Sequence, residues 1–85
     1  MQNTKNPLIF LVEDSVVYKD LIVGYLQSKR FKNIETFKSG EDCLSAMGRK
    51  PDIIILDYSY DGISGLELMQ RVRIEHPEID FIFLS

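Results

Sequence analysis

The sequence predicts an α/β domain in which a parallel β-sheet alternates with helices that cover both of its faces. Three apolar runs bounded by proline or charged residues predict strands at 8–12, 53–56 and 81–84. Runs without a polar position are typical of strands buried on both faces. Helical patterns separate the strands, and such crossovers indicate parallel pairing. The predicted order is β-α-β-α-β-α-β within 85 residues, which is room for one domain.

The first part of the chain predicts a strand and an amphipathic helix. Residues 1–6 are polar and are expected to be a flexible lead-in to the strand at 8–12. After it, Asp14 or Ser15 can serve as the N-cap of a helix. Spacings of three and four place apolar residues on one stripe of that helix. The stripe consists of Tyr18, Leu21, Ile22, Tyr25 and Leu26.

A second strand and helix follow. The mixed polarity of residues 34–37 predicts an edge strand. Ser39 and Gly40 begin a helix pattern whose small apolar face contains Cys43, Leu44 and Met47. Gly48 is expected to be the residue just past its end, where glycine adopts the left-handed conformation without strain.

The second half repeats the alternation of strand and helix. The strand at 53–56 ends at Asp57, and a loop at 58–63 follows. Ser64 and Glu67 form an S-x-x-E capping box, which predicts a helix start. The helix should stop at His76-Pro77, before the strand at 81–84. Its apolar residues are Leu66, Leu68, Met69 and Val72.

The composition excludes several classes of protein. One cysteine, Cys43, rules out a disulfide scaffold, and this residue is expected to be a small buried hydrophobe. A net charge of -3 weighs against a nucleic-acid-binding surface. No apolar run approaches the ~20 residues of a membrane helix, and the start lacks a signal peptide. We therefore expect a cytoplasmic protein.

Acidic and hydroxyl side chains follow three of the predicted strands. Glu13 and Asp14 come after the first strand, Asp57 ends the third, and Ser85 follows the fourth. The carboxyl ends of parallel strands form one edge, where ligands of open α/β sheets bind. Clustered carboxylates repel one another, and Mg²⁺ with its oxygen ligands would stabilise them. One carboxylate could then act as a nucleophile toward a phosphoryl donor.

Four segments, taken together, resemble the receiver domain of two-component response regulators. They are residues 11–15, 51–57, 65–68 and 83–85, which occur in the order of that family. The resemblance covers the chain after residue 6. It implies a three-layer, flavodoxin-like fold with strand order 2-1-3-4-5, here with four strands and three helices. Residues 1–85 would thus be one incomplete receiver domain, truncated before the last helix-strand-helix portion.

The resemblance also implies a role for each residue of the site. Asp57 matches the phosphoacceptor, and Asp14 matches the direct Mg²⁺ ligand. Glu13 takes the other acidic position and would act through water. The backbone carbonyl of Ser59 matches a further metal ligand, and Ser85 matches the switch hydroxyl that binds the phosphoryl group.

The function implied is a signalling module. Asp57 would accept a phosphoryl group from a histidine kinase or histidine phosphotransfer protein, and the modification would switch a surface. The chain would not be a turnover enzyme. A pseudo-receiver that acts only as an interaction module is an alternative. A Mg²⁺-dependent phosphohydrolase fits less well, because Ser59 stands where such sites often have an acid. A nucleotide-binding domain would need a glycine-rich turn after the first strand.

The chain departs from the family pattern at several positions. Asp61 stands where the family usually has proline, Ser64 where it often has aspartate, and Tyr60 where methionine is common. No lysine follows a strand beyond the fourth, so the family's switch lysine has no counterpart. Asp61 adds a fourth carboxylate near the site.

The last strand carries an expectation of its own. If the chain ends at Ser85, the strand at 81–84 is an apolar sheet edge without a charge to block pairing. Apolar surface beside the first helix would also be uncovered. We therefore expect self-association, through the edge of the fourth strand or by exchange of elements between chains.

Overall fold

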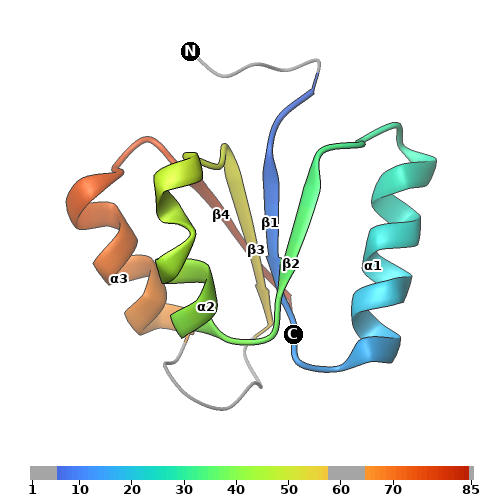
Figure 1. The fold of residues 1–85 in the computed structure, drawn as a ribbon, viewed down its shortest axis with the longest axis horizontal. Helices are drawn as coiled ribbons and strands as arrows, with labels where there is room; N and C mark the ends of the chain where they lie inside the picture. Colours follow the sequence, from blue (N-terminus) through green and yellow to red (C-terminus); the bar gives the residue numbers. More distant parts are fainter. Residues whose placement is uncertain (1–5, 58–64, 85) are drawn as a thin grey trace.

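The sheet has four parallel strands in the order β2-β1-β3-β4. The computed structural model describes residues 6–57 and 65–84 (Figure 1). The strands are β1 (Ile9–Val12), β2 (Ile34–Phe37), β3 (Ile53–Asp57) and β4 (Asp80–Leu84). The helices are α1 (Val16–Ser28), α2 (Gly40–Ser45) and α3 (Gly65–Glu75), with a short 3-10 helix η1 (Met47–Arg49). This confirms the predicted alternation, the parallel sheet and its strand order.

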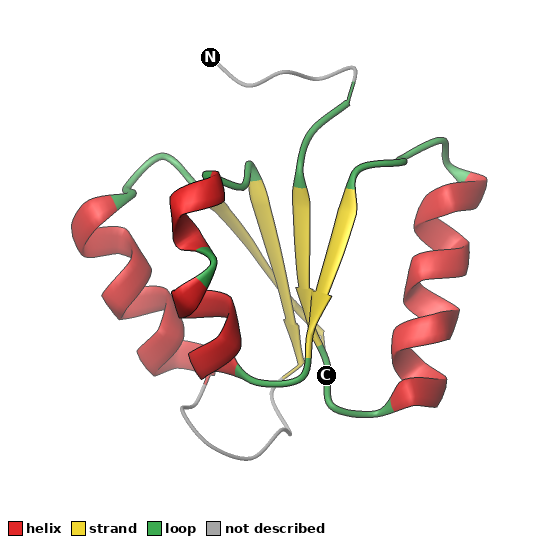
Figure 2. Cartoon of the chain, in the orientation of Figure 1, coloured by secondary structure: helices red, strands yellow, loops and turns green. Residues whose placement is uncertain are grey.

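The molecule has three layers. Figure 2 shows α1 on one side of the sheet and α2 and α3 on the other. Alternate residues of β1 serve the two faces, as the pleat of a strand requires. Phe10 belongs to the core under α2 and α3, whereas Ile9 and Leu11 belong to the core under α1. No described helix is long and apolar enough to span a membrane.

β4 differs from the other two apolar strands. β1 is buried throughout, but Ile82 of β4 is 45% exposed. The prediction that this run is buried on both faces is therefore wrong. Among the described residues β4 pairs with β3 alone, and α1 lies over the other half of the sheet.

The contact face of α1 is not the predicted stripe. Ile22 and Leu26 pack on the sheet together with Val23, whereas Leu21 and Tyr25 are each 63% exposed. The predicted stripe is right at two positions and wrong at the others, including Tyr18, which is also exposed. The helix carries two adjoining apolar stripes, and spacing alone does not say which one meets the sheet.

The predicted starts of α1 and α2 agree with the structure, but the predicted end of the second helical segment does not. Ser15 caps α1, its Oγ accepting the Tyr18 N–H at 3.3 Å, and Ser39 caps α2 in the same way. The expectation for Gly48 is wrong, because it lies inside η1, and Lys50 has the left-handed conformation instead (φ 56). α3 ends before His76 as predicted.

Inside α3, Leu68 and Val72 are buried, but Leu66 is exposed, contrary to its predicted place on the apolar face. Ser64, with its predicted capping box, lies outside the described residues. So do the loop at 58–63 and most of the predicted lead-in.

Candidate functional site

The carboxyl ends of β1 and β3 lie side by side at one edge of the sheet. Val12 pairs with Leu56, so the residues that follow them, Glu13 and Asp57, are neighbours along this edge. On the other side of β3, Asp57 pairs with Leu84. The backbone thus brings together two acidic positions that are far apart in the sequence.

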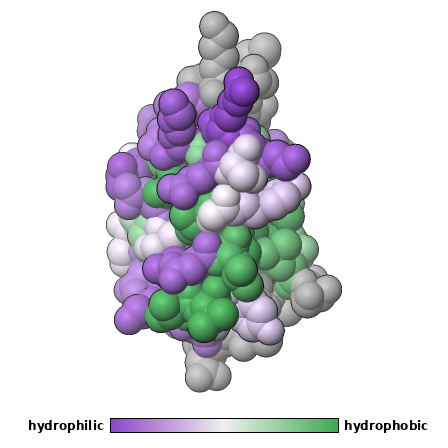
Figure 3. Space-filling model, turned by 90° about the vertical axis from the view of Figure 1, so that its right-hand side faces the viewer, coloured by the Kyte–Doolittle hydropathy of each residue, from purple (hydrophilic) through white to green (hydrophobic). Residues whose placement is uncertain are grey.

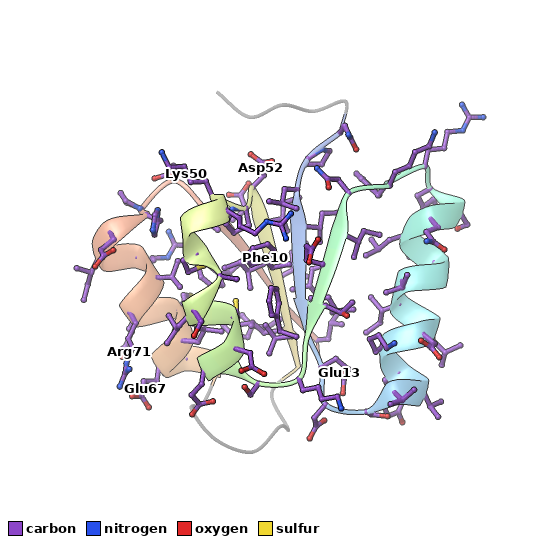
Figure 4. All side chains as sticks on the ribbon, viewed as in Figure 1. Phe10, Glu13, Lys50, Asp52, Glu67 and Arg71 are labelled. Carbon is purple, nitrogen blue, oxygen red and sulfur yellow. The ribbon has the colours of Figure 1, made fainter. Side chains whose placement is uncertain are left out.

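The register of these strands is fixed at their opposite ends. The Leu8 N–H donates to the Asp52 carboxylate at 2.8 Å, and the Asp52 N–H donates to the Leu8 carbonyl, also at 2.8 Å. Figure 4 shows Asp52 and Glu13 at opposite ends of the sheet. Since a slip of one residue would turn every side chain to the other face, this clamp also positions the acidic edge. This role of Asp52 was not predicted from the sequence.

Glu13 is a buried acid, with 4% of its surface exposed. Its N–H donates to the Phe37 carbonyl at 2.9 Å, which ties the end of β1 to the end of β2. Its Oε2 accepts the Ser15 N–H at 3.1 Å. A carboxylate is costly to bury without such donors. Glu13 is therefore held in a fixed position at the rim, directly before the start of α1.

Asp14 is exposed, in contrast to its neighbour. The two acids line a hollow of about 160 Å³ between the ends of β1 and β2 and the first turn of α1. The remaining lining residues are Val16, Lys19, Thr36, Phe37 and Lys38. Carboxylate oxygens at the end of parallel strands are the donor set that Mg²⁺ prefers. An exposed Asp14 beside a buried Glu13 suits one direct ligand and one residue acting through water.

Two lysines at this hollow were missed by the sequence analysis. Lys38 follows β2 directly and so lies at the same edge as the acids. Lys19 lies in the first turns of α1, and its Nζ pairs with Asp20 at 3.0 Å. The signal for Lys38 was available, since any residue after a strand of a parallel sheet reaches this edge. Both lysines bring positive charge to the lining of the hollow that the two acids share.

Several predicted site residues lie outside the described part of the chain. They are Ser59, Ser85, Asp61 and the side chain of Asp57. Of the predicted metal ligands, the described side chains are those of Glu13 and Asp14. Among the described side chains, no three acidic, histidine or cysteine residues form a cluster that could hold a metal.

Comparison with known proteins identifies the family. The sequence profile of the response regulator receiver domain matches residues 9–85. The chain belongs to the response regulator receiver family. The transcriptional regulatory protein CreB of Escherichia coli is 36% identical over 78 residues, which are 91% of this chain and 34% of CreB. The receiver chain thus spans about a third of that relative.

Solved receiver structures share the fold. The N-terminal domain of a response regulator receiver protein from Methanoculleus marisnigri is 28% identical with a TM-score of 0.81. The superposition covers 93% of this chain and 66% of the other. The receiver domain of Saccharomyces cerevisiae Ssk1, crystallised with the histidine phosphotransfer protein Ypd1, has a TM-score of 0.83 at 15% identity. That match covers 95% of this chain and 64% of the other, and it bears on the fold alone.

Proposed function

We propose that this receiver domain accepts a phosphoryl group on Asp57 from a phosphohistidine, in a reaction that requires Mg²⁺. The observation that carries the proposal is the register of β1 and β3, which brings Asp57 level with Glu13, the residue before Asp14, in a chain of the receiver family. A carboxylate oxygen of Asp57 would form the new P–O bond while the P–N bond to the donor histidine breaks. The histidine nitrogen keeps the electron pair and takes up a proton.

Residues near Asp57 would bind the metal ion and the transferred phosphoryl group. Asp14, Asp57 and the backbone carbonyl of Ser59 would hold Mg²⁺, with Glu13 acting through water. When bound, the ion neutralises charge on the transferring phosphoryl group. The burial of Glu13 and its bond from Ser15 support a fixed position for this acid. The Ser85 hydroxyl would bind the phosphoryl oxygens and couple phosphorylation to a change of surface.

The phosphodonor would be a histidine kinase or a histidine phosphotransfer protein. The first turn of α1 begins beside the acidic edge and exposes Val16, Val17 and Tyr18. Exposed apolar residues next to a reactive site are typical of a docking surface. The complex of Ypd1 with the Ssk1 receiver is a precedent for such a partner in a protein of the same fold. We propose that this turn of α1 contacts the donor protein.

Phosphorylation can be tested with a small donor. The chain is incubated with acetyl phosphate and Mg²⁺, and its intact mass is followed. We expect a gain of one phosphoryl group that hydroxylamine removes, as for an acyl phosphate, and no gain in EDTA. Asp57→Asn should abolish the gain. Asp80→Asn, at the opposite end of the sheet, is the matched control and should behave as wild type.

Two results would contradict the proposal. Equal labelling of wild type and Asp57→Asn would place the phosphoryl group elsewhere. A chain that binds a phosphotransfer protein but never gains the phosphoryl group would be a pseudo-receiver.

A further inference from the structure

A lysine stands in one row with two acids at the carboxyl edge of the sheet. The register of β1 with β2 and with β3 brings Lys38, Glu13 and Asp57 level with one another. The Glu13 N–H donates to the Phe37 carbonyl at 2.9 Å, which holds the residue before Lys38 against the end of β1. Neighbouring strands are about 4.8 Å apart, so the backbone of Lys38 lies about 5 Å from that of Glu13 and about 10 Å from that of Asp57.

The side chain of Lys38 lines the same hollow as Glu13 and Asp14. Lys38 is exposed, and among the described side chains it takes part in no ion pair. Lys19, the other lysine of the hollow, differs in this respect, because its Nζ lies 3.0 Å from the Asp20 carboxylate. The charge of Lys19 is thus balanced by its neighbour in α1, whereas the charge of Lys38 is available to the two acids of the hollow.

The surface next to the hollow is apolar rather than basic. The first turn of α1 exposes Val16, Val17 and Tyr18. Figure 3, which views the molecule from the α1 side, shows hydrophobic residues gathered over the lower half of this face, where α1 begins. In the described part of the chain, the positive charge at the hollow therefore comes from the two lysines of its lining and not from a broad basic surface.

We propose that Lys38 sets the affinity of the receiver for Mg²⁺ by acting as a built-in counter-ion of Glu13 and Asp14. In the metal-free state its ammonium group offsets the repulsion between the neighbouring carboxylates. The same charge opposes a divalent cation at the acidic edge, so a higher Mg²⁺ concentration is needed to fill the site. This inference rests on the Mg²⁺ requirement of the proposed function and adds a residue that regulates it.

The size of the effect follows from the distance and the charges. A unit charge about 10 Å from a divalent ion changes the affinity for that ion about fourfold, even with the dielectric constant of water. A lower effective dielectric constant at the protein surface enlarges the factor. Reversal of the charge doubles the electrostatic free energy and therefore squares the factor.

The test is Mg²⁺ binding to the chain, measured by isothermal titration calorimetry at low ionic strength without a phosphodonor. We expect Lys38→Met to bind Mg²⁺ about four times more tightly than wild type does, and Lys38→Glu more than ten times more tightly. Lys38→Arg keeps the charge and should bind as wild type does. Circular dichroism confirms that each variant is folded.

The matched control is Lys32→Met, which changes the net charge by the same amount. Lys32 is also exposed and comes before β2, whereas Lys38 follows it, so the two lysines lie at opposite ends of one strand. Six residues of extended chain separate them, which is about 20 Å. At that distance the loss of a charge should change the Mg²⁺ affinity less than twofold.

Two further measurements examine the electrostatic origin of the effect. In EDTA, Lys38→Met should melt at a lower temperature than wild type, because the acids lose their counter-ion. In saturating Mg²⁺ the variant should gain more in melting temperature than wild type does. The difference in Mg²⁺ affinity between the two should shrink when KCl is raised to 0.5 M, since salt screens exposed charges over a few ångströms.

Four results would overturn the proposal. Equal Mg²⁺ affinities of wild type and Lys38→Met would do so and would leave the proposed function intact if both chains still gain a phosphoryl group on Asp57. Equal effects of Lys38→Met and Lys32→Met would assign the change to net charge alone. A difference that persists unchanged in 0.5 M KCl would assign it to the shape of the hollow. No binding of Mg²⁺ by any variant would contradict the metal requirement of the proposed function, and this inference with it.

Discussion

Gly65 in the first turn of α3 lies against the ring of Phe83 in β4. A Cβ atom at Gly65 would stand 3.1 Å from Cε1 of Phe83 and 3.6 Å from Cδ1 of Leu56. The absence of a side chain therefore lets the helix after the predicted 58–63 loop rest directly on the two strands that end at the acidic edge. Few real Cβ atoms have a neighbour this close, so alanine would push the ring or the helix outward.

Gly65→Ala should lower the free energy of unfolding by about 1 kcal/mol, because overpacking outweighs the higher helix propensity of alanine. Urea unfolding measures the change. Gly24→Ala is the control, since nothing lies within 4 Å of that position, and it should stabilise the chain by up to about 1 kcal/mol. Equal effects of the two substitutions would show that the contact with Phe83 is not tight.

Mg²⁺ should raise the melting temperature of the chain if the acidic edge binds it. Binding to the folded state alone adds about 2.7 kcal/mol at a concentration one hundredfold above the dissociation constant. Asp14→Ala should remove this effect, because Asp14 is the exposed acid of the hollow. Scanning calorimetry with and without Mg²⁺ gives the shift, and Asp80→Ala should keep it. A shift that persists in Asp14→Ala would place the ion elsewhere.

A substitution at Val17 can separate the docking of a protein donor from the phosphorylation reaction at Asp57. Val17→Glu adds a charge to the exposed first turn of α1 without touching the core. We expect transfer from a phosphorylated histidine phosphotransfer protein to slow at least tenfold, whereas labelling by acetyl phosphate stays unchanged. Ile74→Glu should affect neither reaction. Equal slowing with both donors would mean that the substitution disturbs the site itself.

The buried thiol of Cys43 should make the free energy of unfolding depend on pH above about pH 9. Burial raises the pKa of its thiol from 9.0 to about 12. Above pH 9 the unfolded chain loses this proton and the folded chain keeps it. Stability present below pH 9 should therefore fall as the pH rises toward 12, by up to about 1.4 kcal/mol per pH unit. Unfolding of wild type and Cys43→Ala between pH 8 and 11 isolates this contribution, because the other groups titrate in both. If the free energies of unfolding of wild type and Cys43→Ala change in parallel over this pH range, the predicted contribution of Cys43 is absent.

The central strands could be predicted from the sequence because both of their faces are covered. Residues 8–12 and 53–56 contain no polar position, and no choice between faces was needed to predict them. α1 was harder, because its two adjoining apolar stripes fit the same spacing, and Val23 rather than Tyr25 meets the sheet. The exposure of β4 depends on which elements lie beside it in space. The pattern of residues along one strand carries no information about those elements.

The same limit applies to the acidic edge. The positions of Glu13 and Asp57 followed from the rule that parallel strands end together. The burial of Glu13 did not follow from that rule, because the rule says nothing of the neighbouring strand β2 and the turn at Ser15, to both of which Glu13 is hydrogen-bonded. Lys38 could have been found by the same rule, had it been applied to basic residues as well as acidic ones.

The sheet order also bears on how the chain folds as the ribosome makes it. β1 is synthesised first yet lies inside the sheet, between β2 and β3. Its apolar residues can pair with β2 early, but their second neighbour is not available until β3 has left the exit tunnel. Ile9 pairs with Ile53, so one edge of the fully apolar β1 stays open until the chain has grown by a further 44 residues (53 − 9). A shielding factor such as a chaperone would be of most use to this protein in that interval.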